Sequence, residues 1–84
     1  MTPKQKKAHL AALTAMIQGL GFEKDAWNNW KRIFKDDIYR IKVKQINIRI
    51  EIKYSGTRIW RKIVSKPIVN FSLTEMAIFL NRFV

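Results

Sequence analysis

Residues 39–54 read YRIKVKQINIRIEIKY, and apolar and polar side chains alternate along nearly the whole stretch. A period of two is typical of β-strands, whose successive side chains point to opposite faces of a sheet. The apolar series changes parity between Val43 and Ile46. A two-residue hairpin turn at Lys44-Gln45 explains the change and places Val43 and Ile46 on one face; a bulge in one long strand is the alternative. We favour the hairpin, because a single strand of about seventeen residues would far exceed the usual length.

Two further turns extend this hairpin into a meander. Residues 55–56 (Ser-Gly) and 36–37 (Asp-Asp) are suited to turns, and the second would join an earlier strand over residues 30–35. The predicted sheet is therefore an antiparallel meander of three to four strands with one apolar face. Its expected cross-strand pairs are Trp30 with Val43, Phe34 with Tyr39, Ile48 with Ile63 and Ile52 with Ile59. The same register sets Arg61 on the apolar face opposite Ile50, a conflict unless Arg61 lies at an edge or extends its charge to solvent.

A helix is expected at each end of the chain. The first runs from Pro3 to about residue 18, behind a Thr2 N-cap, and its apolar residues recur at helical spacing. The second follows Ser72, which forms a capping-box pattern with Glu75, and its apolar stripe includes Phe79. The predicted fold class is therefore α+β, with an N-terminal helix, the meander sheet and a C-terminal helix, and with both helices packed on one sheet face.

The segment between the first helix and the sheet is expected to form a loop or a single helical turn. Its turn formers include Asp25 and Asn28, whereas Trp27 and Trp30 favour burial. We expect this segment to hold both tryptophans over the core.

The residue inventory argues against an enzyme. The chain has 84 residues, no cysteine and one histidine, His9, which lies in the predicted first helix. No phosphate-binding loop or dinucleotide fingerprint is present. We therefore expect a single small domain without catalytic activity, metal or cofactor. A core of this size must be well packed or be completed by self-association, so a homo-oligomer is an option.

The sequence also bears on location. No stretch approaches the roughly 18 apolar residues that a membrane span requires. The N-terminal lysines are not followed by the uninterrupted apolar segment of a signal peptide. We expect a cytoplasmic protein.

The charge balance is the strongest compositional signal. Lys and Arg number 17 against six Asp and Glu, a net charge of +11. Such an excess favours an anionic partner, which can be nucleic acid, an acidic protein or a membrane surface.

The polar side of the predicted sheet collects many of these cations. In the predicted register Arg40, Arg49 and Lys62 form one cross-strand row, and Lys53 faces Arg58. Like charges in opposite positions destabilise a sheet, so local stability does not explain them. Trp60, Ile33 and Ile38 fall on the same side, and an aromatic ring among cations can stack a base while the cations hold phosphates. The candidate nucleic-acid-binding residues are Lys31, Lys35, Arg40, Lys42, Arg49, Lys53, Arg58, Trp60 and Lys62. The alternatives are an acidic protein partner and a solvated face with the function elsewhere.

Two resemblances accompany this interpretation. The order of helix, strands and helix resembles the double-stranded RNA-binding domain, but that family has a lysine-rich cluster where this chain has residues 73–76, LTEM. Residues 21–51 are similar to short uncharacterised proteins of phage and prophage genomes. The motifs that carry this similarity are Gly21-Phe22, Trp27-Asn28-Asn29-Trp30-Lys31, Tyr39-Arg40-x-Lys42 and Arg49-x-Glu51. The second resemblance implies an accessory protein of a virus or mobile element and brings no known activity with it.

Overall fold

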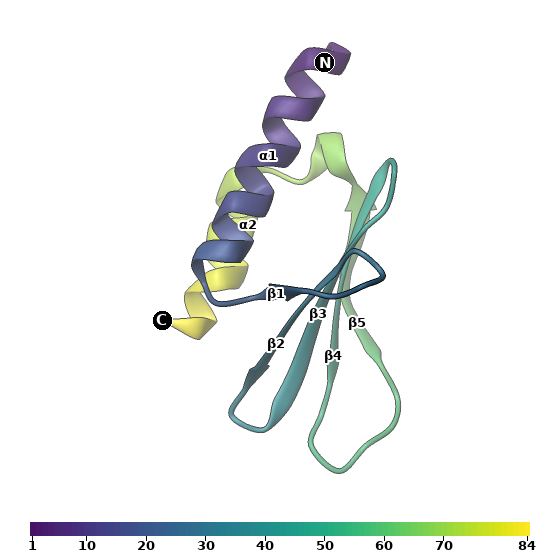
Figure 1. The fold of residues 1–84 in the computed structure, drawn as a ribbon, viewed down its shortest axis with the longest axis vertical. Coiled ribbons are helices and arrows are strands. Elements are labelled where there is room, and N and C mark those ends of the chain that lie inside the picture. Colours follow the sequence, from purple (N-terminus) through teal and green to yellow (C-terminus); the bar gives the residue numbers. More distant parts are fainter.

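Five strands form one antiparallel sheet in the order β1-β2-β3-β4-β5, and both α-helices lie on the same side of it (Figure 1). This is seen in a computed structural model that describes residues 1–84. The elements, in chain order, are α1 (Pro3–Gly19), β1 (Glu23–Lys24), β2 (Asn29–Phe34), β3 (Asp37–Val43), β4 (Asn47–Lys53), β5 (Arg61–Pro67), η1 (Ile68–Asn70), α2 (Leu73–Leu80) and η2 (Asn81–Phe83). The predicted α+β class and helix placement are confirmed, and the sheet has one strand more than the upper predicted number. No helix has the length and apolar character that crossing a membrane requires.

Both helices begin at the predicted caps. The Thr2 hydroxyl accepts the backbone N–H of Gln5, and the Gln5 side chain accepts the N–H of Thr2, which completes a capping box. The Ser72 hydroxyl accepts the N–H of Glu75 at the start of α2. The first helix stops because Gly21 adopts a φ of 84°, a left-handed conformation that glycine takes without steric cost.

The first two hairpins of the meander differ in register from the prediction. The β2–β3 turn is centred on Lys35 and Asp36, which have φ angles of 51° and 70°, so Trp30 lies opposite Ile41 rather than Val43. The predicted pairing of Phe34 with Tyr39 is wrong for the same reason, since Phe34 lies opposite Asp37. A turn displaced by one residue changes the pairing by two positions, which leaves every strand residue on its predicted face.

The β3–β4 turn is likewise displaced by one residue. The N–H of Lys44 donates to the Asn47 carbonyl, and Val43 lies opposite Ile48. Ile46 is therefore a turn residue that is 63% exposed, so its predicted place on the apolar face is wrong. The Ile46 carbonyl accepts the N–H of Ile68, a bond of 2.8 Å that holds the turn beside η1.

Arg61 stays on the apolar face, but it is the first residue of the edge strand β5 and is exposed, as one of the two expected solutions required. Ile52 lies opposite Arg61 rather than Ile59, and residues 57–60 belong to no strand. A register shift between Ile50 and Glu51 then brings Val64 opposite Ile50. The predicted pairing of Ile48 with Ile63 is wrong as well, because Lys66 lies opposite Ile48. The structure has the predicted hairpin, and not a bulge, between β3 and β4. The register shift of the sheet lies instead in the β4–β5 pairing.

The core lies between the sheet and the helices. It contains fourteen buried apolar residues, among them Ile48, Ile50 and Ile52, as the alternation predicts. At one end, the rings of Tyr39 and Phe83 meet edge to face with centroids 4.8 Å apart. Trp30 packs against this core, whereas the expected burial of Trp27 is wrong, because its side chain is 81% exposed.

Two cations on the helix-covered side of the sheet make contacts with the helices or their termini. Arg32 donates a hydrogen bond to the Leu20 carbonyl, and its guanidinium stands 5.1 Å from the centre of the Phe83 ring. Lys66 forms an ion pair with Glu75 of α2. These contacts tie the end of α1 and the start of α2 to the sheet. Neither cation therefore contributes its charge to the opposite face of the sheet.

Candidate nucleic-acid interface

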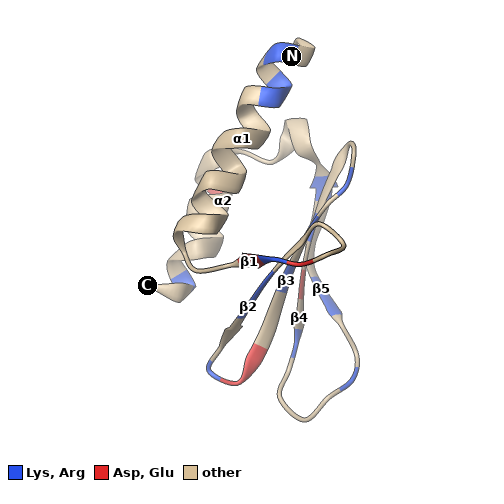
Figure 2. Ribbon diagram, in the orientation of Figure 1, with Lys and Arg blue, Asp and Glu red and all other residues tan.

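The face of the sheet turned away from the helices, here called the bare face, is covered by no other element (Figure 1). Lys and Arg occur along the strands and their loops and at the start of α1, whereas few charges lie on the rest of the helices (Figure 2). The alternation of side chains assigns the following strand positions to the bare face: Glu23, Asn29, Lys31, Ile33, Ile38, Arg40, Lys42, Asn47, Arg49, Glu51, Lys53, Lys62, Ser65 and Pro67. Two of them are acids, Glu51 in the middle of the sheet and the exposed Glu23 on the edge strand β1.

Glu51 is the centre of this face. Its side chain is 5% exposed, and its Oε1 accepts hydrogen bonds from Arg40 Nε at 3.1 Å and from a terminal nitrogen of the same guanidinium at 2.9 Å. Oε2 accepts a bond of 3.1 Å from Arg49 Nε, and Lys42 Nζ lies 3.5 Å from Oε1. A buried carboxylate is tolerated only when it is paired and hydrogen-bonded, and here three cations satisfy it. We call these four residues the Glu51 cluster.

The charge state of Glu51 follows from these contacts. Burial alone would raise the pKa of its carboxyl group, but the hydrogen bonds from Arg40 and Arg49 and the charges of Arg40 and Lys42 outweigh burial. The pKa of Glu51 therefore lies below its ordinary value, and the carboxylate is ionised at neutral pH. An ionised carboxylate held in this way is suited to a salt bridge rather than to general acid catalysis.

The predicted row of Arg40, Arg49 and Lys62 is wrong. Arg40 lies opposite Glu51, which in turn lies opposite Lys62, whereas Arg49 lies in the next row opposite Lys42. The cause is the displaced β3–β4 turn, together with the late start of β5. The observed row alternates in charge, so it stabilises the sheet where the predicted row would have destabilised it.

Trp60 lies on the bare face, directly before β5. The Arg40 guanidinium carbon is 3.8 Å from the centre of the Trp60 ring, and Lys53 Nζ is 5.4 Å from it. Arg40 is thus held at its edge by Glu51 and covered on its face by an indole, an arrangement suited to a planar, delocalised cation. Trp60 itself is only partly exposed.

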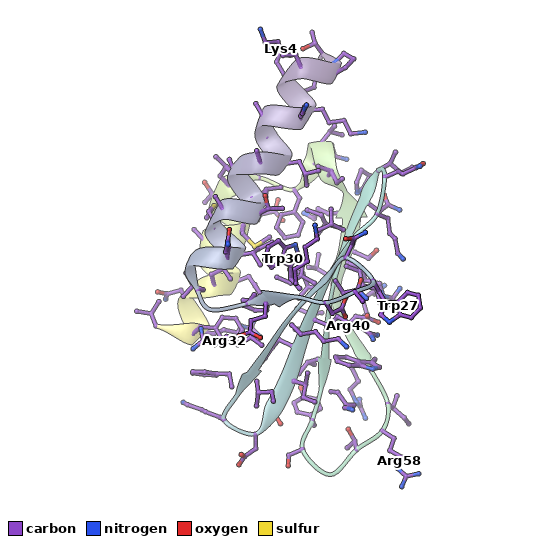
Figure 3. All side chains as sticks on the ribbon, viewed as in Figure 1. Lys4, Trp27, Trp30, Arg32, Arg40 and Arg58 are labelled. Atoms are coloured by element: carbon purple, nitrogen blue, oxygen red, sulfur yellow. The ribbon has the colours of Figure 1, made fainter.

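The remaining predicted residues divide into two groups. Lys31 lies opposite Arg40 and forms an ion pair of 3.3 Å with Asp25, and Lys62 is exposed. Lys35 and Arg58 are not part of the cluster. Lys35 is a turn residue whose Nζ lies over the Phe34 ring, and Arg58 belongs to the loop between β4 and β5, far along it from Arg40 (Figure 3). The predicted opposition of Lys53 and Arg58 is also wrong, because β5 begins only at Arg61 and Arg58 pairs with no strand residue.

Trp27 is the residue of this face that sequence reasoning missed. Figure 3 shows it on the same side of the sheet as Arg40, whereas Trp30 and Arg32 point toward the helices. The available signal was Asp25, because an aspartate often accepts the backbone N–H two residues ahead and forms a tight turn. Of the two predicted forms, a loop or a single helical turn, the segment takes the form of a loop with this turn, which exposes Trp27.

The face offers charge and aromatic surface rather than reactive groups. No three His, Cys, Asp or Glu side chains gather where they could hold a metal ion. His9 Nε2 lies 2.7 Å from the Phe71 carbonyl, where it joins α1 to the segment before α2. No protein-family model, no curated protein and no solved structure matches the chain.

Proposed function

We propose that this protein is a non-enzymatic module that binds nucleic acid through the bare face of its sheet. The observation that carries the proposal is the stack of Arg40 on Trp60, 3.8 Å apart, among further cations. A nucleic acid presents phosphates and planar bases together, and a face of cations with an aromatic ring matches both features.

The role of Glu51 supports this proposal rather than opposing it. Its carboxylate is buried and shared among three cations, so it lends little negative potential to the surface. Lys53 and Lys62 are not paired with any acid, and their ammonium groups remain available to phosphate oxygens. Contacts of this kind position a nucleic acid without reading its sequence.

A second candidate is an interaction protein, of the phage-accessory kind that the sequence resemblance suggests, that docks on an acidic protein surface. The observation that favours it is the exposure of two isoleucines, Ile33 at 71% and Ile59 at 72%. Phosphates offer nothing to an aliphatic side chain, whereas a protein partner can bury it.

The test compares two double variants that remove equal charge from different surfaces. Lys53→Gln with Lys62→Gln changes the bare face, and Lys4→Gln with Lys7→Gln changes exposed positions at the start of α1. Binding of a labelled oligonucleotide is measured by anisotropy across a salt series. We expect the bare-face variant to weaken binding and to reduce the slope of log K against log salt by about 0.7 per lost contact with single strands.

The outcomes distinguish the bare-face site from attraction by global charge, and the proposed function from the second candidate. If the α1 variant weakens binding as much as the bare-face variant, attraction depends on global charge and the bare face is not the site. If the wild-type protein binds no oligonucleotide at low salt, the proposal is wrong. Specific capture of an acidic protein that survives nuclease treatment would then support the second candidate.

A further inference from the structure

Trp27 is an exposed tryptophan on a rigid turn. Asp25 Oδ1 accepts the backbone N–H of Trp27 at 2.8 Å and that of Asn29 at 3.0 Å, and the N–H of Asp25 donates to the Asn29 carbonyl at 2.9 Å. Asn28 completes the turn with a φ of 63°. An 81% exposed indole forgoes the stabilisation that burial of so large an apolar side chain would bring. Fold stability therefore does not explain this position, whereas a fixed, exposed ring is well prepared for binding.

A series of neighbouring residues joins Trp27 to the Arg40–Trp60 stack. The turn that positions Trp27 is built on Asp25, whose Oδ2 lies 3.3 Å from Lys31 Nζ. Lys31 lies opposite Arg40 in the β2–β3 pairing, and Arg40 stacks on Trp60. The path thus runs from an aromatic ring, across two cations, to a second aromatic ring, all on the bare face.

We infer that the ligand is single-stranded nucleic acid, and that Trp27 stacks one of its bases while Trp60 stacks another. This inference rests on the proposed function and names the ligand class of the same face. A single strand exposes the planes of its bases, whereas in a duplex each base is already covered by its neighbours. Phosphates between the two stacked bases lie against Lys31 and Arg40.

The spacing of the strands sets the scale of this site. The path crosses from Lys31 on β2 to Arg40 on β3, one strand interval of about 4.8 Å, and the Trp60 ring lies over Arg40. Trp27 lies beyond the Lys31 end of this path and Trp60 at its Arg40 end, so each ring is placed to bind a different base of one strand.

The experiment measures the affinity of Trp27 variants for an oligo(dT) strand and for a duplex of equal length. Trp27→Ala should lower single-strand affinity by about 5- to 150-fold, the range for loss of one stacked base, and leave duplex affinity unchanged. Trp27→Phe should retain most of the affinity, whereas Trp27→Leu, which keeps apolar surface without an aromatic ring, should not. A thermal melt should be the same for all variants, because the turn is held by Asp25 and the main chain.

The outcomes separate this inference from the proposed function. Equal binding of single strand and duplex that Trp27→Ala does not change would overturn the inference and leave the proposed function standing. An equal loss for both ligands would make Trp27 a general contact and would also overturn it. Absence of binding to either ligand by the wild-type protein would end both proposals.

Discussion

Glu51 offers the sharpest test of how the bare face is held together. Glu51→Gln keeps the size of the side chain and removes its charge. The amide keeps one acceptor oxygen and replaces the other with a donor, so Arg40 and Arg49 can no longer both be accepted, and Arg40, Arg49 and Lys42 all lose their counterion. We expect the variant to be less stable than the wild-type protein at neutral pH, even though it lowers the number of buried charges.

The size of the loss follows from the exposure of the three cations. Removal of one partner from a fully buried ion pair costs about 3–5 kcal/mol, because the other charge is left uncompensated. Here Arg40 is the most enclosed, with 15% of its side chain exposed, while Lys42 at 27% and Arg49 at 45% can turn to water. We therefore expect the free energy of unfolding to fall by about 2–4 kcal/mol. A chain of this length has roughly 4–13 kcal/mol in total, so the variant should fold with a clear loss.

The pH dependence distinguishes this mechanism from simple loss of packing. The pKa of Glu51 lies below its unfolded-state value, so its contribution to stability is complete above about pH 4.3 and is lost as the pH falls through the lower, folded-state value. The gap between wild type and Glu51→Gln should consequently be widest near neutral pH and should close in acid. The lowered pKa values of Asp25 and Glu75 act in the same direction but are common to both proteins.

Urea unfolding followed by circular dichroism between pH 3 and 7 measures this gap. Glu23→Gln is the control, because Glu23 is an exposed strand carboxyl group outside the ion pairs. The control should match the wild type within about 0.5 kcal/mol. A Glu51→Gln variant as stable as the control, or a gap that does not change with pH, would refute the reasoning.

Two further predictions concern the fold, and thermal or urea unfolding checks both. Phe79→Ala should lower the free energy of unfolding by about 3–5 kcal/mol, because its ring is buried against Tyr39 and Phe83. Ile78→Ala, on the exposed side of α2, should change it by under about 0.5 kcal/mol. Equal effects of the two substitutions would contradict the packing of α2. Asp36→Gly should raise stability by about 0.5–1 kcal/mol, because Asp36 has a φ of 70° that glycine adopts freely, and Asp36→Ala, which removes the same carboxylate but keeps the strain, should not.

The sequence predicted which residues share a face far better than which residues are neighbours. Alternation assigned Arg40, Arg49 and Trp60 to the side away from the helices, and the structure agrees. A turn shifted by one residue moves a pairing by two positions, which preserves the face and changes every partner. Burial patterns constrain only the face, so they could not reveal that Glu51 lies between Arg40 and Lys62.

The conformation of each turn determines which residues pair, and the alternation of apolar residues does not specify that conformation. Lys35 and Asp36 adopt positive φ angles although neither is glycine, so composition pointed to the wrong pair. Trp27 was misjudged for a related reason. Apolarity argues for burial, but the hydrogen bonds of Asp25 fix the backbone so that this ring extends away from the core.

The observed register changes the interpretation of the positive charge on the bare face. A row of three cations would have opposed folding, and binding would have had to offset that repulsion. With Glu51 in the row, the sheet is stable without a ligand, and the same carboxylate fixes the Arg40 guanidinium under Trp60. The Arg40–Trp60 stack is therefore formed before any partner arrives, and its ordering entropy is not part of the cost of binding. The buried acid of the bare face, Glu51, thus serves the stability of the sheet and, through its two hydrogen bonds from Arg40, the geometry of the proposed interface.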